Sequence, residues 1–175
     1  SRTKMSIEYP ANFMLVCSMN PCPCGNYGNA NIECTCTPVT IQKYTSKISG
    51  PLLDRIDIHI EVPAVKYQDI SSTVIGESSE KARSVQTERF AESKNVYKNA
   101  DMASKDIRKY CKLDTSSQDL LKMAMNKLGF SARAHDRILK VARTIADLSG
   151  SEHIKVEHIS EAIQYRSLDR QYWKS

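Results

Sequence analysis

The segment that most constrains the fold is residues 47–62, KISGPLLDRIDIHIEV, in which a Gly-Pro break precedes an alternating run. Residues 56–62 place apolar and polar side chains in turn, which is the period of a β-strand that covers a core with one face. Pro63 closes the run, because proline cannot donate to a sheet ladder. The segment predicts a strand that is entered through a turn carrying Arg55.

A second predicted strand lies upstream, at residues 13–17, FMLVC. A continuous apolar run of this length is typical of a strand buried on both faces of a parallel sheet. It is followed by Asn20 and Pro21. Ligands of open parallel sheets bind beyond the carboxyl ends of the strands, so the Asn20 amide could hold an attacking water or a phosphate oxygen there. A simple Asn-Pro turn is the alternative.

Helical patterns dominate from residue 71 onward, after one earlier helix predicted at residues 37–49. The charged residues 77–93 predict a connecting helix. Ser104 is expected to cap the next helix, and a capping box at Thr115–Gln118 is expected to begin the one after it. Ser131 caps a long helix, and residues 155–166 form the last. We expect these two helices to bury Ala134, Ile138, Leu139, Val141, Ala142, Ile145 and Ala146, and then Val156, Ile159, Ala162 and Ile163.

The predicted fold class is therefore α/β plus all-α. A parallel-sheet region at residues 1–70 is followed by a connecting helix within residues 71–98 and a helical domain at residues 99–175.

Two arginines are candidates for binding phosphate. Arg55 follows the LLD turn, and a guanidinium there could fork onto phosphate oxygens of a neighbouring subunit. A surface arginine paired with Asp54 or Asp57 is the alternative. Arg133 lies in the first turn of the long predicted helix, where the macrodipole favours anions, although an exposed helix arginine is equally ordinary. Arg137 and Arg143 are better placed for packing or salt links.

Four of the six cysteines cluster as Cys22-Pro-Cys24 and Cys34-Thr-Cys36. Two short knuckles of this kind can surround a tetrahedral zinc ion with four thiolates. Reduced free thiols in an ordered loop and a disulfide are the alternatives. In each case we expect the loop to be structural rather than catalytic. If zinc is bound, four thiolate ligands leave no open position on the metal for a substrate.

Composition and charge indicate the cellular location of the chain and the kind of partner that it could bind. No apolar run approaches the length needed to cross a bilayer, and no export signal is visible, so we expect a cytoplasmic protein with reduced cysteines and no membrane partner. The net charge of +5 arises after residue 70 and is compatible with a phosphate-rich partner without requiring one. The chain contains neither a G-x-x-x-x-G-K-[ST] loop nor an apolar run ending in Asp-Glu for magnesium.

Three segments together resemble the magnesium-chelatase-like AAA+ ATPases, and more closely the ComM group, also called YifB. They are YPANFMLVCSMNPCPCG, ISGPLLDRIDIHIEVP and FSARAHDRILKVARTIADLSG. The resemblance is to the carboxyl-terminal part of that family, after its Walker A and Walker B motifs. It implies a partial AAA+ core followed by a helical lid, and a chain that cannot hydrolyse ATP alone.

The resemblance also implies roles for individual residues. Asn20 matches the sensor-1 residue, Arg55 the arginine finger and Arg133 the sensor-2 arginine. Residues 1–9 match one strand of a hairpin that lines the pore of related ring helicases, so Arg2 and Lys4 could face DNA. Family members are hexameric motors that use ATP and Mg²⁺, and the ComM group is associated with branch migration during natural transformation.

Two other classes of function remain open from the sequence. The first is a zinc-stabilised module that binds nucleic acid without an ATPase role, using the cysteine loop and basic helices. The second is a helical adaptor, residues 99–175, that docks a partner protein. The alternation of residues 56–62 favours the ATPase, because neither alternative needs a sheet with polar groups at its edge.

Overall fold

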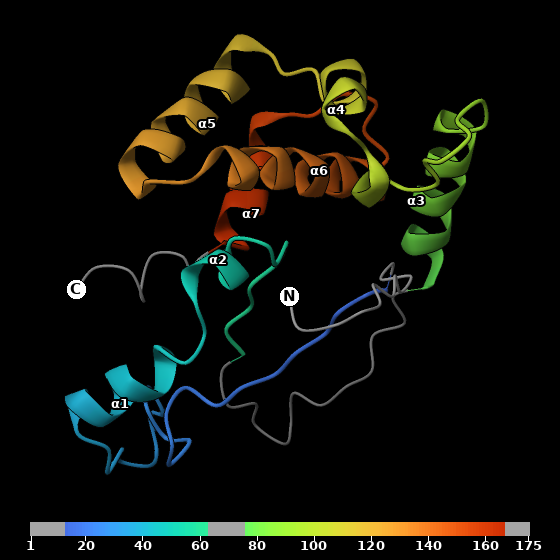
Figure 1. The fold of residues 1–175 in the computed structure, drawn as a ribbon. Helices are drawn as coiled ribbons and strands as arrows, with labels where there is room; N and C mark the ends of the chain where they lie inside the picture. Colours follow the sequence, from blue (N-terminus) through green and yellow to red (C-terminus); the bar gives the residue numbers. More distant parts are fainter. Residues whose placement is uncertain (1–12, 63–75, 167–175) are drawn as a thin grey trace, which may run out of the picture. The chain divides into compact units, whose positions relative to one another are not determined.

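A computed structural model describes residues 13–62 and 76–166 (Figure 1). The chain divides into two compact units, Ser1–Tyr44 and Thr45–Ser175, and each is considered by itself. The regular structure of the described residues is helical, and none of these helices is long and apolar enough to cross a membrane. The helices are α1 (Pro38–Thr45), α2 (Gly50–Leu53), α3 (Gly76–Arg89), the 3₁₀ helix η2 (Asn99–Asp101), α4 (Ser104–Tyr110), α5 (Thr115–Leu128), α6 (Ala132–Leu148) and α7 (Val156–Gln164).

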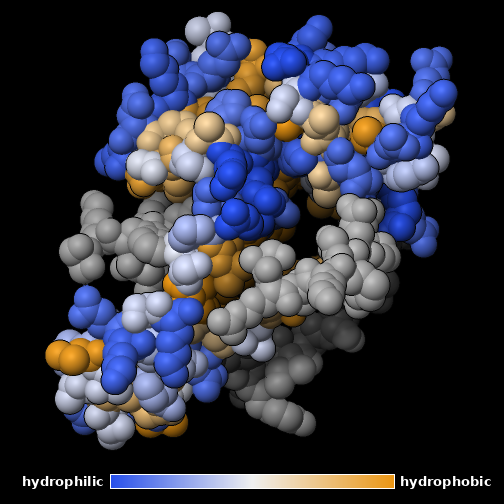
Figure 2. All heavy atoms as spheres, viewed as in Figure 1, coloured by the Kyte–Doolittle hydropathy of each residue, from blue (hydrophilic) through white to orange (hydrophobic). Residues whose placement is uncertain are grey.

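The second unit contains a helical bundle built around α6, which packs against α3, α4, α7 and η2 (Figure 1). The buried face of α6 follows the i, i+4 spacing, and α5 and α7 close the core from other sides. Hydrophilic side chains cover most of the visible face of the bundle (Figure 2). The core residues on these three helices are Leu121, Ala124, Ala134, Ile138, Leu139, Ala142, Ala146, Ile159, Ala162 and Ile163. The predicted inner faces of α6 and α7 are thus confirmed, apart from Val156 and from Val141 and Ile145, which are only partly buried.

Val156 is an exception on α7, where it was predicted to be buried. It is the first residue of the helix and is 39% exposed, because the packed face begins only at His158 and Ile159.

The N-terminal caps of the bundle helices agree with the sequence prediction for α6 and differ from it for α4 and α5. Ser131 caps α6 as predicted, since its Oγ accepts a hydrogen bond from the Ala134 N–H at 3.1 Å. The predicted capping box at Thr115–Gln118 is wrong. The cap of α5 is Asp114, whose carboxylate accepts from the Ser117 N–H at 2.8 Å, so the helix is capped one residue earlier than predicted. Ser104 likewise is the first residue of α4 rather than its cap.

A buried ionic cluster joins α3, η2 and α6. The Asp147 carboxylate is fully buried and accepts hydrogen bonds from Arg89 at 2.5 and 2.7 Å. It also accepts from Arg143 Nε at 3.1 Å and from the Asn99 amide at 2.8 Å. The salt link predicted for Arg143 is therefore present, and one carboxylate compensates two guanidinium groups inside the bundle.

Replacing Asp147 with alanine should lower the free energy of unfolding of the helical unit by about 3–5 kcal/mol, because two largely buried guanidinium groups would lose their shared counterion. Urea unfolding measured by circular dichroism would show this loss. Asp119→Ala, on the exposed side of α5, is the matched control and should change the unfolding free energy by less than about 0.5 kcal/mol. Equal effects of the two substitutions would show that the cluster does not stabilise the bundle.

The two predicted strands are not formed in the described part of the chain. Residues 13–17 are extended but unpaired, with Phe13 71% and Met14 87% exposed. Residues 56–62 contribute only one parallel bridge, between His59 and Arg166. The prediction of a buried strand fails here because strand backbone groups need a neighbouring strand, and the described residues place none beside either segment.

The Gly-Pro break at residues 50 and 51 was predicted to form a turn, and it forms a helix instead. It opens the short helix α2, in which Pro51 occupies the first turn, where its missing N–H costs nothing.

The predicted domain limits at residues 70 and 98 stay predictions, and residue 70 lies outside the described residues.

Candidate functional site

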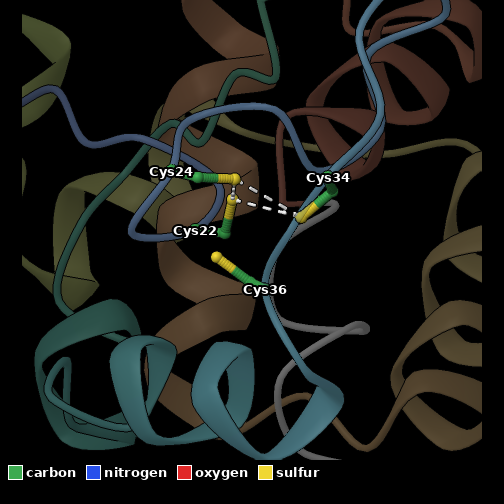
Figure 3. A group of neighbouring side chains, drawn as sticks. All are labelled: Cys22, Cys24, Cys34 and Cys36. Atoms are coloured by element: carbon green, nitrogen blue, oxygen red, sulfur yellow. Dashed lines mark hydrogen bonds between the residues drawn. The ribbon is translucent and has the colours of Figure 1, made fainter.

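Four cysteine thiols converge in the first unit (Figure 3). The sulfur atoms of Cys22, Cys24, Cys34 and Cys36 all lie within 4.8 Å of one another. Cys22 Sγ lies 3.3 Å from Cys24 Sγ and 3.7 Å from Cys34 Sγ, and Cys24 Sγ lies 3.6 Å from Cys34 Sγ. Sulfurs at the corners of a tetrahedron around zinc are roughly 3.8 Å apart, given Zn–S bonds of about 2.3 Å. The four thiols therefore fit a tetrahedral zinc ion.

Backbone N–H groups surround the thiols and favour their ionised forms. The pKa of the Cys24 thiol is lowered to about 5, first by the Asn26 N–H and then by the Cys22 thiol. The Cys36 N–H acts in the same direction on Cys34. Burial and the neighbouring thiols nevertheless raise the pKa of Cys34 to about 12. The pKa of Cys22 is also lowered, whereas the pKa of Cys36, like that of Cys34, is raised. Ionisation of all four thiols therefore needs a cation that offsets the added negative charge.

The loop that carries the cysteines has almost no apolar core. Cys22 is the only buried residue among residues 13–44, and Gly25 turns the chain with a φ of +83°. Ordering the backbone costs roughly 1–2 kcal/mol per residue, which burial of one thiol cannot offset. A metal ion bound by four thiolates would contribute about 10–16 kcal/mol toward that cost. All six cysteines are free in the structure, so the predicted disulfide alternative is not formed.

Asn20 lies directly before this loop, in an exposed stretch of extended chain rather than at the end of a strand. A Cβ atom placed on Gly25 would lie 3.7 Å from Asn20 Nδ2, an ordinary contact distance, so the Asn20 amide lies against the cysteine loop. Asn20 belongs to the first unit, whereas Arg55 and Arg133 belong to the second.

Arg55 is exposed and follows α2 and its C-cap, Asp54. Its Nη1 donates to the Pro51 carbonyl at 2.8 Å, which folds the side chain back over its own turn. The alternative of a pair with Asp54 or Asp57 is wrong for this structure. Asp54 accepts hydrogen bonds from Ser131, and Asp57 pairs with Arg137. The Arg55 guanidinium is therefore exposed and forms no ion pair with a described carboxylate.

Arg133 is the second residue of α6 and is also exposed. No residue in ranges 13–62 and 76–166 forms a hydrogen bond or ion pair with its guanidinium. Its place in the first turn of a 17-residue helix, beside unsatisfied backbone N–H groups, suits contact with an anion. The predicted place of Arg133 in the first turn of the long helix is confirmed, and its role stays a prediction. Arg2 and Lys4, the predicted DNA contacts, lie outside the described residues.

The salt link predicted for Arg137 is present, with Asp57 as its partner, but the sequence did not identify the set of residues that together hold the Arg55 turn in place. They are Asp54 and Asp57 on the turn, and Ser131, Arg137 and Arg166 on the helical domain. The sequence feature that indicated ionic contacts at this turn is the unusual run of charges in LLDRID. Their partners are more than 75 residues away, and charge alone does not identify a partner at that distance.

Comparison with known proteins gives a consistent family for both units. Residues 1–70 match the family described as magnesium chelatase, subunit ChlI, and residues 69–166 match magnesium chelatase, subunit ChlI C-terminal. The uncharacterised protein YifB of Escherichia coli is 44% identical over 174 residues, which are 97% of this chain and 34% of YifB. The competence protein ComM of Haemophilus influenzae is 41% identical over 178 residues, again 97% of this chain and 34% of the relative. The chain thus spans about a third of the length of these relatives.

Proposed function

This chain belongs to the magnesium chelatase ChlI family, and from that premise we propose that it supplies the sensing and trans-acting groups of an ATP-hydrolysing ring motor. The observation that supports the proposal is that one unit presents two exposed guanidinium groups, Arg55 and Arg133, and that neither is paired with a described carboxylate. Buried, neutralised arginines could not serve a phosphate.

In the proposed mechanism the groups of this chain act by position and charge. Arg55 reaches the nucleotide of the adjacent subunit and stabilises the charge that develops on the phosphoryl oxygens. Arg133 binds the terminal phosphate of its own subunit's nucleotide, and Asn20 orients the attacking water. Magnesium, when bound with ATP, neutralises phosphate charge. The loops that grip nucleotide and metal belong to other parts of the longer protein. We propose that residues 13–17 and 56–62 join the parallel sheet of that larger core.

Further parts of the proposal concern assembly and substrate. Arg55 can act in trans only in an oligomer, which we propose is a closed hexameric ring. A relative is named for competence, and DNA is the substrate that we propose for the motor. Arg2 and Lys4 would then contact its backbone, a contact that weakens as salt concentration rises.

The four cysteines are proposed to hold one structural zinc ion, since their spacing fits the metal and the loop lacks a core of its own. Zinc would fix the loop next to Asn20 without entering the reaction. The alternative of a nucleic-acid-binding zinc module is less well supported. Residues 13–44 contain a single basic residue, Lys43, and a single acidic one, Glu33, so this unit has almost no charge with which to hold phosphate.

Arg133→Ala tests the nucleotide-sensing role in the full-length protein. It should weaken ATP binding about tenfold or more and leave ADP binding nearly unchanged, because a charge-assisted hydrogen bond to the terminal phosphate is worth about 1.5–3 kcal/mol. Isothermal titration with ATP and ADP measures both affinities. Arg108→Ala, an exposed arginine on α4, is the matched control. An unchanged ratio of ATP to ADP affinity in the Arg133 variant would rule out the role.

A further inference from the structure

We propose that Asp54 and Asp57 are positioning residues, which fasten the Arg55 turn to the first turn of α6 and so make Arg55 follow the helix that carries Arg133. The inference rests on the proposed function of these two arginines. We refer to Asp54 and Asp57, with their partners Ser131, Arg137 and Arg166, as the arginine latch.

The first half of the latch is Asp54, which immediately precedes Arg55. Its two carboxylate oxygens accept hydrogen bonds from the Ser131 hydroxyl at 2.8 and 3.0 Å. Ser131 Oγ also accepts from the Ala134 N–H, so the residue that caps α6 binds the arginine turn at the same time. Arg166 Nη2 lies 3.8 Å from the same carboxylate.

The second half of the latch lies on the other side of Arg55. The Ile56 carbonyl accepts from Arg166 Nη1 at 2.8 Å, and the Asp57 carboxylate pairs with Arg137 on α6. Further along, the His59 N–H donates to the Tyr165 carbonyl at 2.6 Å. The backbone is therefore held to the helical domain both before and after Arg55.

Burial indicates which contact carries most of the positioning. The Arg166 side chain is fully buried, and its guanidinium carbon lies 6.0 Å from the centre of the Phe130 ring. The Asp57 and Arg137 side chains are more open to solvent, and exposed pairs hold their geometry weakly. The hydrogen bonds from Ser131 to Asp54 are also exposed to solvent. We therefore assign the larger share to Arg166, which lies near the Asp54 carboxylate and donates to the Ile56 carbonyl, and smaller shares to Ser131 and Asp57.

The latch fixes the turn and leaves the Arg55 head free to reach outward. The Arg55 side chain is exposed, and its hydrogen bond goes to the Pro51 carbonyl rather than to a latch residue. Ser131 is two residues from Arg133, in the same turn of α6. A shift of α6 that follows the nucleotide state at Arg133 is thereby passed to Arg55. In a ring, this links the nucleotide of one subunit to hydrolysis in the next.

The test is turnover of ATP by the full-length assembled protein. Asp54→Ala should lower kcat roughly ten- to a hundredfold with KM unchanged, because misplacing a catalytic group by about 1 Å costs that much. The double variant Asp54→Ala/Arg55→Ala should be no slower than Arg55→Ala alone, since Asp54 acts only through Arg55. A role in general stability would instead add to the loss.

A second variant separates the latch from the helix cap. Ser131→Asp keeps a capping oxygen for α6 and places a carboxylate against Asp54, so it should also lower kcat at least tenfold. Ser131→Thr keeps both the cap and the donor and should restore the wild-type rate. Asp119→Ala, an exposed aspartate on α5, is the control for loss of a negative charge.

The outcomes distinguish this inference from the proposed function. If Arg55→Ala itself leaves kcat unchanged, the proposed function fails and the latch has nothing to position. If Arg55→Ala abolishes turnover while Asp54→Ala and Ser131→Asp both retain the wild-type kcat, the latch alone is overturned. Additive losses in the double variant overturn it as well.

Discussion

Arg55→Ala in the full-length protein is expected to reduce the turnover number for ATP about a thousandfold or more, while ATP affinity stays within about twofold of the wild type. A guanidinium supplied by a neighbouring subunit stabilises charge that develops only in the transition state, so its loss lowers kcat rather than binding. Steady-state hydrolysis and direct nucleotide titration measure the two quantities separately.

Two further variants control for charge and geometry at this position. Arg55→Lys keeps the charge and loses the planar fork, so it should recover only part of the rate. Arg108→Ala removes an exposed arginine on α4 and should leave kcat unchanged. Near-normal hydrolysis by assembled Arg55→Ala rings would reject the catalytic role of this residue.

Loss of zinc is expected to have the largest effect on stability. The purified protein should contain one zinc ion per chain, and its removal should unfold the cysteine loop, because zinc bound by four thiolates contributes about 10–16 kcal/mol at neutral pH. Limited proteolysis should then cleave between Cys24 and Cys34, whereas the helical unit remains resistant. Affinity for the metal should fall as pH is lowered, since protons compete for the thiolates.

Individual cysteines provide the controls for the metal site. Cys24→Ser should abolish stoichiometric zinc, as measured by elemental mass spectrometry. Cys17→Ser should retain it, because Cys17 is exposed and outside the group of four converging thiols. A protein that is folded, protease-resistant and free of zinc would contradict the metal assignment.

The helical bundle could be predicted from the sequence because its signals are local. The 3.6-residue period of α6 identified Ile138 and Ala142 as core residues, and both are fully buried. Ser131 marked the start of α6, and its hydroxyl caps that helix as predicted. Where two good capping residues stand side by side, as Asp114 and Thr115 do, the pattern could not choose between them.

The sheet and the arginine latch depend on partners that a local pattern does not identify. A strand at residues 13–17 needs neighbouring strands to pair with. The apolar run indicates a propensity to form a strand, and the described residues provide no strand beside it. Asp54 and Ser131 are 77 positions apart, and each has an ordinary local explanation, as a turn acid and as a helix cap. The cysteine cluster was predictable because four ligands lie within fifteen residues and their chemistry suits one metal.

The most direct test of the account is a mixing experiment with two variants, Arg55→Ala and Arg133→Ala. If Arg55 serves the neighbouring subunit and Arg133 serves its own, about one site in four is complete in rings assembled from an equal mixture. ATP hydrolysis at low substrate concentration should then reach roughly a quarter of the wild-type rate. That rate is above the roughly one tenth or less expected of Arg133→Ala and far above that of Arg55→Ala. A rate equal to the average of the two separate variants would show that the two arginines do not meet across a subunit interface, and would contradict the account.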